Sequence, residues 1–175
     1  MIYFSSNDEF ILKSIINLIT QINPQLVALK DDYSFVNIEI QNRNYLLHFS
    51  YGQKKIIIKA PVKINDIFDS IIQLIFEKSV LINNFQFYPF KQTISYNNTE
   101  VKLNFISNKI LRNLYLHKEN GIDKHILYSF IWPKDKEILI NKLDTHLTNT
   151  KNFIQDNFKI ELNYASKKGI VKLLD

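Results

Sequence analysis

The spacing of apolar positions at the start of the chain predicts a strand followed by a helix. Residues 2–4 form a short apolar run, and residues 6–9 (Ser-Asn-Asp-Glu) have the capping-box pattern that begins a helix. The apolar positions that follow recur every three or four residues until Pro24, which ends the pattern. They are Ile11, Ile15, Ile19 and Ile22.

A second block has the pattern of a β-hairpin, a strand and another helix. Residues 35–49 alternate apolar and polar positions around a turn at residues 41–44. A further strand is expected at residues 56–58, and a helix from about Asn65. The buried face of that helix is expected to contain Ile67, Phe68, Ile71, Ile72 and Ile75. Residues 1–80 therefore predict a small α/β domain.

The remainder, residues 84–175, predicts three strands, three helices and a final hairpin. The helices begin near Asn104, Asp123 and Ile138, of which the first two are good capping residues. The strands are expected at residues 85–88, 93–96 and 100–103, with Asn97 and Asn98 as a turn. The hairpin pairs residues 159–164 with residues 170–174, and residues 166–169 form its tip. This order of elements is typical of a winged helix-turn-helix.

Each of these three helices has an apolar face. In the first two, it consists of Ile106, Ile110, Leu111 and Leu114, and of Ile126, Leu127, Phe130 and Ile131. In the third, which is expected at residues 138–155, it consists of Leu139, Leu143, Leu147 and Ile154. The opposite side of the third helix is polar and carries Lys142, Thr145, Thr148, Asn149 and Asn152.

Composition excludes several classes of function. The chain has no Cys, so thiolate metal sites and cysteine nucleophiles are absent. Its three glycines stand at positions 52, 121 and 169, too far apart for a glycine-rich nucleotide loop. No secretory signal and no apolar window of the ~18 residues that a membrane span needs are present, so we expect a cytoplasmic protein with no membrane partner.

Positive charge is concentrated in the second part of the chain. The net charge is +5, but residues 1–80 hold eight basic and eight acidic residues, so the whole excess lies in residues 81–175. Only two of the 22 basic residues, Arg43 and Arg112, are arginines. This asymmetry is expected when a neutral module is joined to one that approaches phosphates.

Several motifs of the second part occur in a familiar order. Residues 103–104 (Leu-Asn) open the first helix, residues 131–132 (Ile-Trp) end the second, and residues 143–147 (Leu-Asp-Thr-His-Leu) lie in the third. This region resembles the effector domain of OmpR/PhoB-type response regulators, whose motifs at these places are Leu-Thr, Val-Trp and a hydrophobic-acid-Thr/Val-His-Ile core. The resemblance implies a winged helix that binds double-stranded DNA.

The sequence departs from that family at two places. Residues 150–153 (Thr-Lys-Asn-Phe) replace a Leu-Arg-x-Lys run, and residues 165–171 (Ala-Ser-Lys-Lys-Gly-Ile-Val) replace a wing with an Arg and a Gly-x-Gly-Tyr turn. Residues 1–80 look like a shortened, degenerate receiver domain that serves dimerisation through the helix from Asn65. Because no Asp or Glu lies between Glu39 and Asp66, we expect no control by aspartyl phosphorylation.

The predicted fold class is therefore α+β: a small α/β receiver-like N-terminal domain at 1–80, followed by a winged helix-turn-helix domain at 84–175. The predicted DNA-binding residues combine the polar side of the third helix with the wing tip. They are Lys142, Thr145, Thr148, Asn149, Lys151, Asn152, Lys167 and Lys168. The Asn side chains suit adenine, the Thr side chains a phosphate or a thymine methyl group, and the Lys side chains phosphates.

Two other readings of the sequence stay open. A winged fold that has lost DNA binding would be a protein-interaction module. The acidic pairs Asp8-Glu9, Asp31-Asp32 and Asp66-Asp69 suit a metal-dependent nuclease, but each pair also suits a helix start or a turn. We predict a transcription regulator that acts as a homodimer and is not an enzyme, with no cofactor and no metal.

Overall fold

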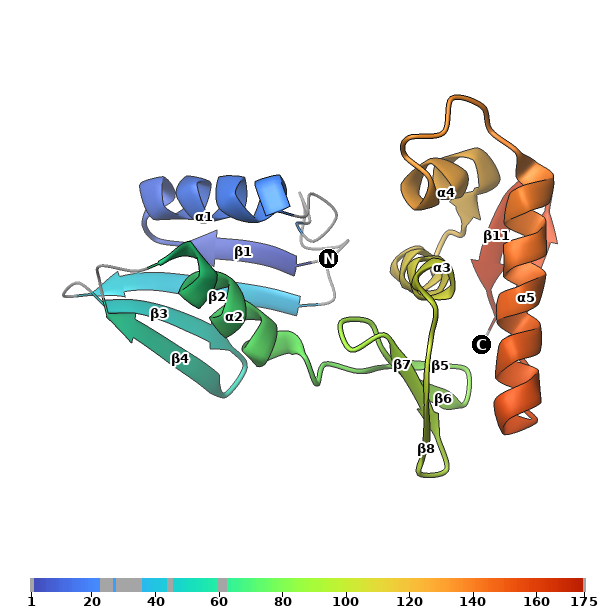
Figure 1. Ribbon diagram of the computed structural model, residues 1–175, viewed down its shortest axis with the longest axis horizontal. Helices are drawn as coiled ribbons and strands as arrows, with labels where there is room; N and C mark the ends of the chain where they lie inside the picture. Colours follow the sequence, from blue (N-terminus) through green and yellow to red (C-terminus); the bar gives the residue numbers. More distant parts are fainter. Residues whose placement is uncertain (1, 23–26, 28–35, 44–45, 60–62, 175) are drawn as a thin grey trace. The chain divides into compact units, whose positions relative to one another are not determined.

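The computed structural model describes residues 2–22, 27, 36–43, 46–59 and 63–174 (Figure 1). Two compact units divide the chain, an N-terminal unit, Met1–Lys78, and a C-terminal unit, Ser79–Asp175. Both contain helices and strands, which confirms the α+β class. The predictions at Pro24, Asp31 and Asp32 lie outside the described residues.

In its described residues, the N-terminal unit contains one four-stranded sheet and two helices. Its elements are β1 (Ile2–Ser6), α1 (Glu9–Ile22), β2 (Val36–Arg43), β3 (Leu46–Tyr51), β4 (Lys54–Lys59) and α2 (Ile64–Ile75). The strand order is β1-β2-β3-β4; β1 and β2 are parallel, whereas β2, β3 and β4 are antiparallel neighbours. Figure 1 shows α1 alongside β1 and α2 in front of β2 and β3.

This sheet corrects the expectation of a receiver-like domain. Receivers of the flavodoxin-like class have a parallel sheet of order 2-1-3-4-5, in which helices connect the strands. Here β2, β3 and β4 follow one another directly, and such short connections allow only antiparallel pairing. The resemblance to a receiver is therefore limited to the opening strand and helix.

Local hydrogen bonds explain where α1 begins. The Asp8 carboxylate accepts a hydrogen bond from the Ile11 N–H at 3.1 Å, and the Ser6 hydroxyl accepts one from the Asp8 N–H at 3.1 Å. Asp8 is therefore the residue that caps the helix, two positions after the Ser6 of the predicted capping box. Ile15 and Ile19 are buried, as the periodicity predicts.

The apolar face of α2 is used within the N-terminal unit. Ile67, Ile71 and Ile75 are buried, and Leu74 joins them, while Ile72 is only half-buried. The outward side of α2 is polar and carries Asn65, Asp66, Asp69 and Gln73. The apolar surface on which dimerisation through this helix was predicted is consequently consumed by the unit's own core. The side chains of Ile22 and Phe68 lie outside the described part.

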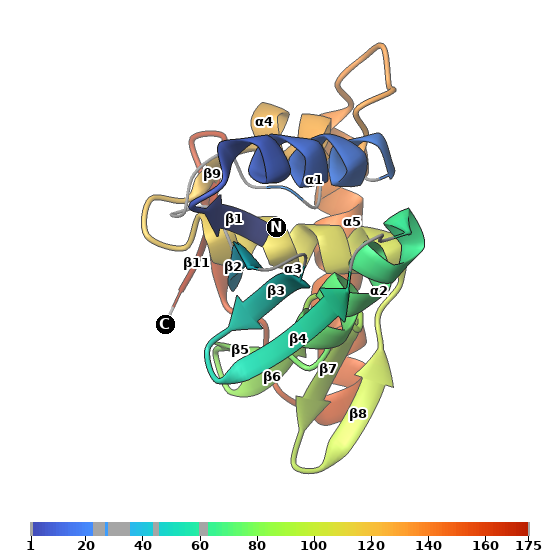
Figure 2. The ribbon, with the colours of Figure 1, turned by 90° about the vertical axis from the view of Figure 1, so that its left-hand side faces the viewer.

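The C-terminal unit opens with a four-stranded antiparallel sheet, followed by three helices and a three-stranded sheet. Its first elements are β5 (Val80–Ile82), β6 (Phe85–Tyr88), β7 (Thr93–Tyr96) and β8 (Thr99–Lys102). The others are α3 (Phe105–Leu116), β9 (Ile122–Asp123), α4 (Lys124–Ile131), α5 (Ile140–Phe158), β10 (Tyr164–Lys167) and β11 (Ile170–Leu173). The strands β5 to β8 lie side by side in that order (Figure 2).

Turn and cap chemistry fixes most of these boundaries. Asn97 and Asn98 have φ angles of 47° and 63°, as a two-residue hairpin turn between β7 and β8 requires. The Asn104 side chain accepts from the Ser107 N–H at 2.8 Å, which caps α3. Asp123 caps α4 by accepting two backbone N–H groups, at 2.8 and 3.2 Å. The capping predictions at Asn104 and Asp123 are confirmed.

Two of the strands, β5 and β9, were not predicted from the sequence. β5 pairs with β6 at residues that were expected to form the domain boundary. β9 pairs with β11, so that the strand order of the last sheet is β10-β11-β9. Two-residue and three-residue strands show too little alternation to be recognised before their partners are known.

Among the described residues, no helix has the length and apolarity needed to cross a bilayer.

Candidate nucleic-acid interface

The helix α5 has one buried side and one open polar side. Its buried residues are Leu143, Leu147, Thr150, Ile154 and Phe158. The exposed residues of α5 that belong to the predicted DNA-binding set are Thr145, Thr148, Asn149 and Asn152. Because these four positions have the spacing i, i+3, i+4 and i+7, they form one stripe along the helix. We call these four residues the α5 stripe.

One threonine of the α5 stripe already makes a hydrogen bond within the chain. The Thr145 hydroxyl donates to the backbone carbonyl of Asn141 at 2.9 Å. Thr148 lies close to the phenol of Tyr164 on β10. By contrast, neither Asn149 nor Asn152 has a hydrogen-bond partner within the described part of the chain. Their amide groups are the open donors and acceptors of the stripe.

Lys142 is placed differently from the rest of the predicted set. Its ammonium group donates to the Asp135 carboxylate at 2.8 Å and lies 4.3 Å from the centre of the Trp132 ring. The Tyr128 hydroxyl donates to the same carboxylate at 2.6 Å. These hydrogen bonds lower the pKa of Asp135, and they raise the pKa values of Lys142 and Tyr128. Lys142 thus anchors the loop before α5, and its contact with DNA stays a prediction.

That loop, residues 132–139, projects from the C-terminal unit between α4 and α5 (Figures 1 and 2). Its first residue, Trp132, packs against Tyr128 and His146 in tilted ring contacts, with ring centroids 4.7 and 5.3 Å apart. The ring is half-buried among these side chains, which agrees with a packing role for Trp132.

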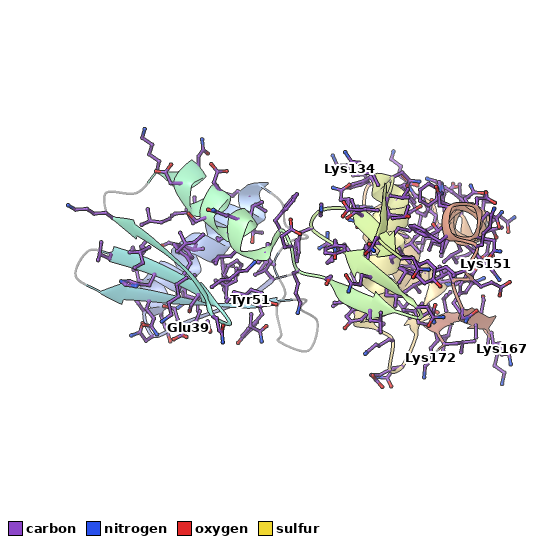
Figure 3. The ribbon with its side chains drawn as sticks, turned by 90° about the horizontal axis from the view of Figure 1, so that it is seen from below. Glu39, Tyr51, Lys134, Lys151, Lys167 and Lys172 are labelled. Carbon is purple, nitrogen blue, oxygen red and sulfur yellow. The ribbon has the colours of Figure 1, made fainter. Side chains whose placement is uncertain are left out.

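The wing hairpin presents two lysines at its tip. Lys168 and Gly169, with φ angles of 51° and 80°, form the two-residue turn, and Lys167 pairs with Ile170 below it. Both lysine side chains are exposed. Lys151, on the flank of α5, lies 3.9 Å from the Glu161 carboxylate, a loose and partly exposed ion pair. Figure 3 shows Lys151 next to α5 and Lys167 on the hairpin.

A brace that the sequence did not reveal connects the wing with α5. The backbone N–H of Lys124 donates to the Gly169 carbonyl at the wing tip at 2.8 Å, and its ammonium group donates to Asp144 of α5 at 2.6 Å. Burial and the nearby Asp144 raise the pKa of Tyr164. Asp144 belongs to the motif at residues 143–147, but nothing in the sequence identified Lys124 as its partner.

A buried polar contact in the middle of α5 fixes this helix on α3. The Thr150 hydroxyl lies 2.9 Å from that of Ser107 and 2.8 Å from the His146 carbonyl. Thr150 is fully buried, and Ser107 nearly so. The α5 stripe, on the opposite side, is thereby held in a defined orientation.

Several apolar residues that were predicted to be buried lie at the surface. The side chains of Ile126, Phe130 and Leu139 are 52%, 40% and 51% exposed. The helix α4 has only eight residues, and it buries Leu127, Tyr128 and Ile131 instead. The periodicity of so short a helix does not decide which of two neighbouring faces turns inward.

The acidic residues that would suit a nuclease cap a helix, form an ion pair with a neighbouring residue or lie exposed on a helix. Asp8 caps α1, Glu9 forms an ion pair with Lys13 at 3.1 Å, and Asp66 and Asp69 lie on the exposed side of α2. No group of three or more His, Asp or Glu side chains that could hold a metal ion occurs among the described residues.

No family model matches the sequence, and neither does any curated protein. Among solved structures, the DNA-binding domain of E. coli CadC is 17% identical, with a TM-score of 0.48 over 55% of this chain and 91% of that chain. The Klebsiella pneumoniae RstA DNA-binding domain, solved in complex with the RstA box, is 12% identical, with a TM-score of 0.46 over 55% of this chain and 97% of that chain.

A third similar structure is described as a novel family of redox sensors in the streptococci that evolved from two-component response regulators. It is 13% identical, with a TM-score of 0.45, and the alignment covers 67% of this chain and 56% of that chain. At these low identities, a function has to be argued from the side chains of this protein.

Proposed function

We propose that the C-terminal unit binds double-stranded DNA in a sequence-dependent way and that the protein is a transcription regulator of the OmpR/PhoB-like response-regulator type. The observation that carries this proposal is the α5 stripe beside a wing with Lys167 and Lys168 at its tip, both braced by Lys124. A major groove admits an α-helix whose polar side faces the bases. Lysines beside it supply the phosphate contacts.

We also propose that aspartyl phosphorylation does not control the protein. Receiver phosphorylation needs an acidic pair that holds Mg²⁺ and a nearby acceptor Asp. Asp8 is occupied as the cap of α1, Glu9 pairs with Lys13, and residues 40–65 contain no carboxylate side chain. Stoichiometric labelling by a small-molecule phosphodonor that disappears on changing a single Asp would contradict this proposal.

The test of DNA binding is fluorescence anisotropy of the full chain with a pool of A·T-rich duplexes at several salt concentrations. We expect steep salt dependence, with a log–log slope of about −5 for a dimer that makes roughly six phosphate contacts. The variant Lys167→Ala/Lys168→Ala should bind all duplexes more weakly and with a shallower slope.

A matched control variant separates the effect of charge at the wing tip from the effect of the total charge of the protein. Lys54 and Lys55 are exposed on β4 of the N-terminal unit, so Lys54→Ala/Lys55→Ala removes the same charge from the unit that does not carry the proposed interface. It should bind as the wild type does. Absence of binding at low salt, or equal losses in both double variants, would overturn the proposal.

A second candidate function is a protein-interaction module, and the exposed Ile126, Phe130 and Leu139 favour it. For this function, DNA binding would be absent at low salt. A partner protein would bind the wild type and the Lys167→Ala/Lys168→Ala variant equally, and Ile126→Ser/Phe130→Ser would bind it weakly.

Homodimerisation through the N-terminal unit stays a prediction. A dimer would place two winged helices on two half-sites and would raise the affinity of each. Light scattering after size-exclusion chromatography at the concentration of the binding assay tests it, and a monomer there would contradict it.

A further inference from the structure

The composition of the α5 stripe limits the bases that it can read. Thr145, Thr148, Asn149 and Asn152 form it. Of the two lysines in the described part of α5, Lys142 lies on the same face but is paired with Asp135, and Lys151 lies on the flank. In the major groove, Arg and Lys pair with guanine, Asn and Gln pair with adenine, and apolar groups contact the thymine methyl. The stripe therefore lacks the side chains that favour G·C pairs.

The geometry of Thr145 narrows its role. Its hydroxyl carries a single proton, which is donated to the Asn141 carbonyl. Phosphate oxygens only accept hydrogen bonds, so the hydroxyl has no proton left for them. Since the side chain is exposed, its methyl group remains available for an apolar contact with a thymine methyl.

Asn149 and Asn152 supply the polar part of the stripe. They lie one turn apart, and each amide offers both the donor and the acceptor that adenine requires. Thr148 lies close to Tyr164 of the wing strand β10, so we assign it no base. From Thr145 to Asn152, the helix rises by ~10 Å, about the length of three base pairs.

We infer that α5 reads a short core of A·T pairs, with the Thr145 methyl group on a thymine methyl and the Asn149 and Asn152 amides on adenines. This inference rests on the proposed function, because it assumes that the stripe enters the major groove. It names the class of duplex that this protein recognises.

The first experiment selects duplexes from a random-sequence pool with the full-length wild type and sequences those that are retained. We expect a contiguous A·T core in the enriched duplexes. Enriched duplexes with G·C pairs throughout their common core would overturn the inference while leaving DNA binding intact. No enrichment of any sequence, together with no binding at low salt, would overturn the proposed function itself.

The second experiment removes the two methyl groups separately. Replacing one core thymine at a time by deoxyuridine removes only the C5 methyl group, and Thr145→Ser removes only the protein methyl group while keeping the hydroxyl. For the wild type, one substitution should weaken binding about fourfold. Thr145→Ser should bind the thymine and uracil duplexes equally, and an unchanged preference in this variant would refute the contact.

The third experiment tests the asparagines with an internal control. Asn149→Ala and Asn152→Ala should each lose roughly tenfold or more of the preference for A·T at a single core position. Asn157 is also exposed on α5, but its amide donates to the Phe153 carbonyl at 2.8 Å, so Asn157→Ala should keep the full preference. If all three variants had the same preference for A·T, Asn149 and Asn152 would not be the residues that read adenine.

Discussion

Replacing Thr150 by Val tests how α5 is held on α3. Each hydroxyl carries one proton, so both contacts of Thr150 are satisfied when it donates to the His146 carbonyl and accepts from Ser107. Val has nearly the same shape and is also β-branched, so the change leaves no large cavity and hardly alters helix propensity. What is lost is the polar contact alone.

The magnitude follows from the burial of both groups. Thr150→Val leaves the Ser107 hydroxyl buried without its partner, and an orphaned buried donor costs about 1–3 kcal/mol. For a unit of this size, each kcal/mol corresponds to about 4–8 °C in Tm. Replacing both residues, in Thr150→Val/Ser107→Ala, removes the orphaned group, so the double variant should be more stable than Thr150→Val alone.

The chain contains its own probe for this measurement. Trp132 is the sole tryptophan, and it packs against His146 within the C-terminal unit, so its fluorescence in a urea titration reports the unfolding of that unit. We expect a lower midpoint with an unchanged slope for Thr150→Val. A midpoint equal to that of the wild type, or a double variant that loses the sum of both single effects, would refute the proposed hydrogen-bond pair.

Three further predictions use the same fluorescence titration. Gly121→Ala should lower the stability of the C-terminal unit more than Gly169→Ala does. Both glycines have a positive φ (75° and 80°), but only at Gly121 would a Cβ lie 2.7 Å from a carbon of β11. Equal losses of stability in the two variants would contradict this packing argument. Asp144→Asn should cost about 1–2 kcal/mol, because the Lys124 side chain, 14% exposed, loses its ion-pair partner; no loss would show that the brace carries no stability. The backbone N–H groups at the start of α4 lower the pKa of Asp123 in the folded state. The carboxylate therefore contributes to stability above its unfolded pKa, and this contribution is lost as the pH falls through the folded pKa. When the pH is lowered below about 5, Asp123→Asn should lose less stability than the wild type.

The features that the sequence predicted correctly depend on neighbouring residues. Asn104 and Asp123 cap their helices, and Asn97-Asn98 forms the expected turn, because each of these interactions is completed within a few positions. The exposed positions of the α5 stripe also followed from the periodicity, since a helix of 19 residues has a well-defined buried side.

The features that were missed depend on partners far away in the chain. Periodicity alone did not show that α4 turns Ile126 and Phe130 outward, because the choice depends on how α3 and α5 pack against it. The order of strands in the N-terminal sheet is equally a matter of pairing between segments. The alternation in residues 35–49 correctly predicted the antiparallel pair β2 and β3, but it did not show that β1 pairs in parallel with β2 or that β4 pairs with β3.

The placement of the lysines bears on how the proposed interface would bind DNA. Lys142 is occupied by Asp135, so the C-terminal unit retains three predicted phosphate ligands: Lys151, Lys167 and Lys168. Three contacts correspond to a log–log salt slope of about −3, whereas two units on one duplex approach a slope of about −5. A single winged helix with only these three predicted phosphate contacts, and no arginine on α5, would discriminate through its uncharged stripe but bind weakly. Binding by two copies would therefore be the simplest way to combine this selectivity with affinity. The salt slope distinguishes binding by one copy from binding by two, and it does so without any assumption about which surface joins the copies.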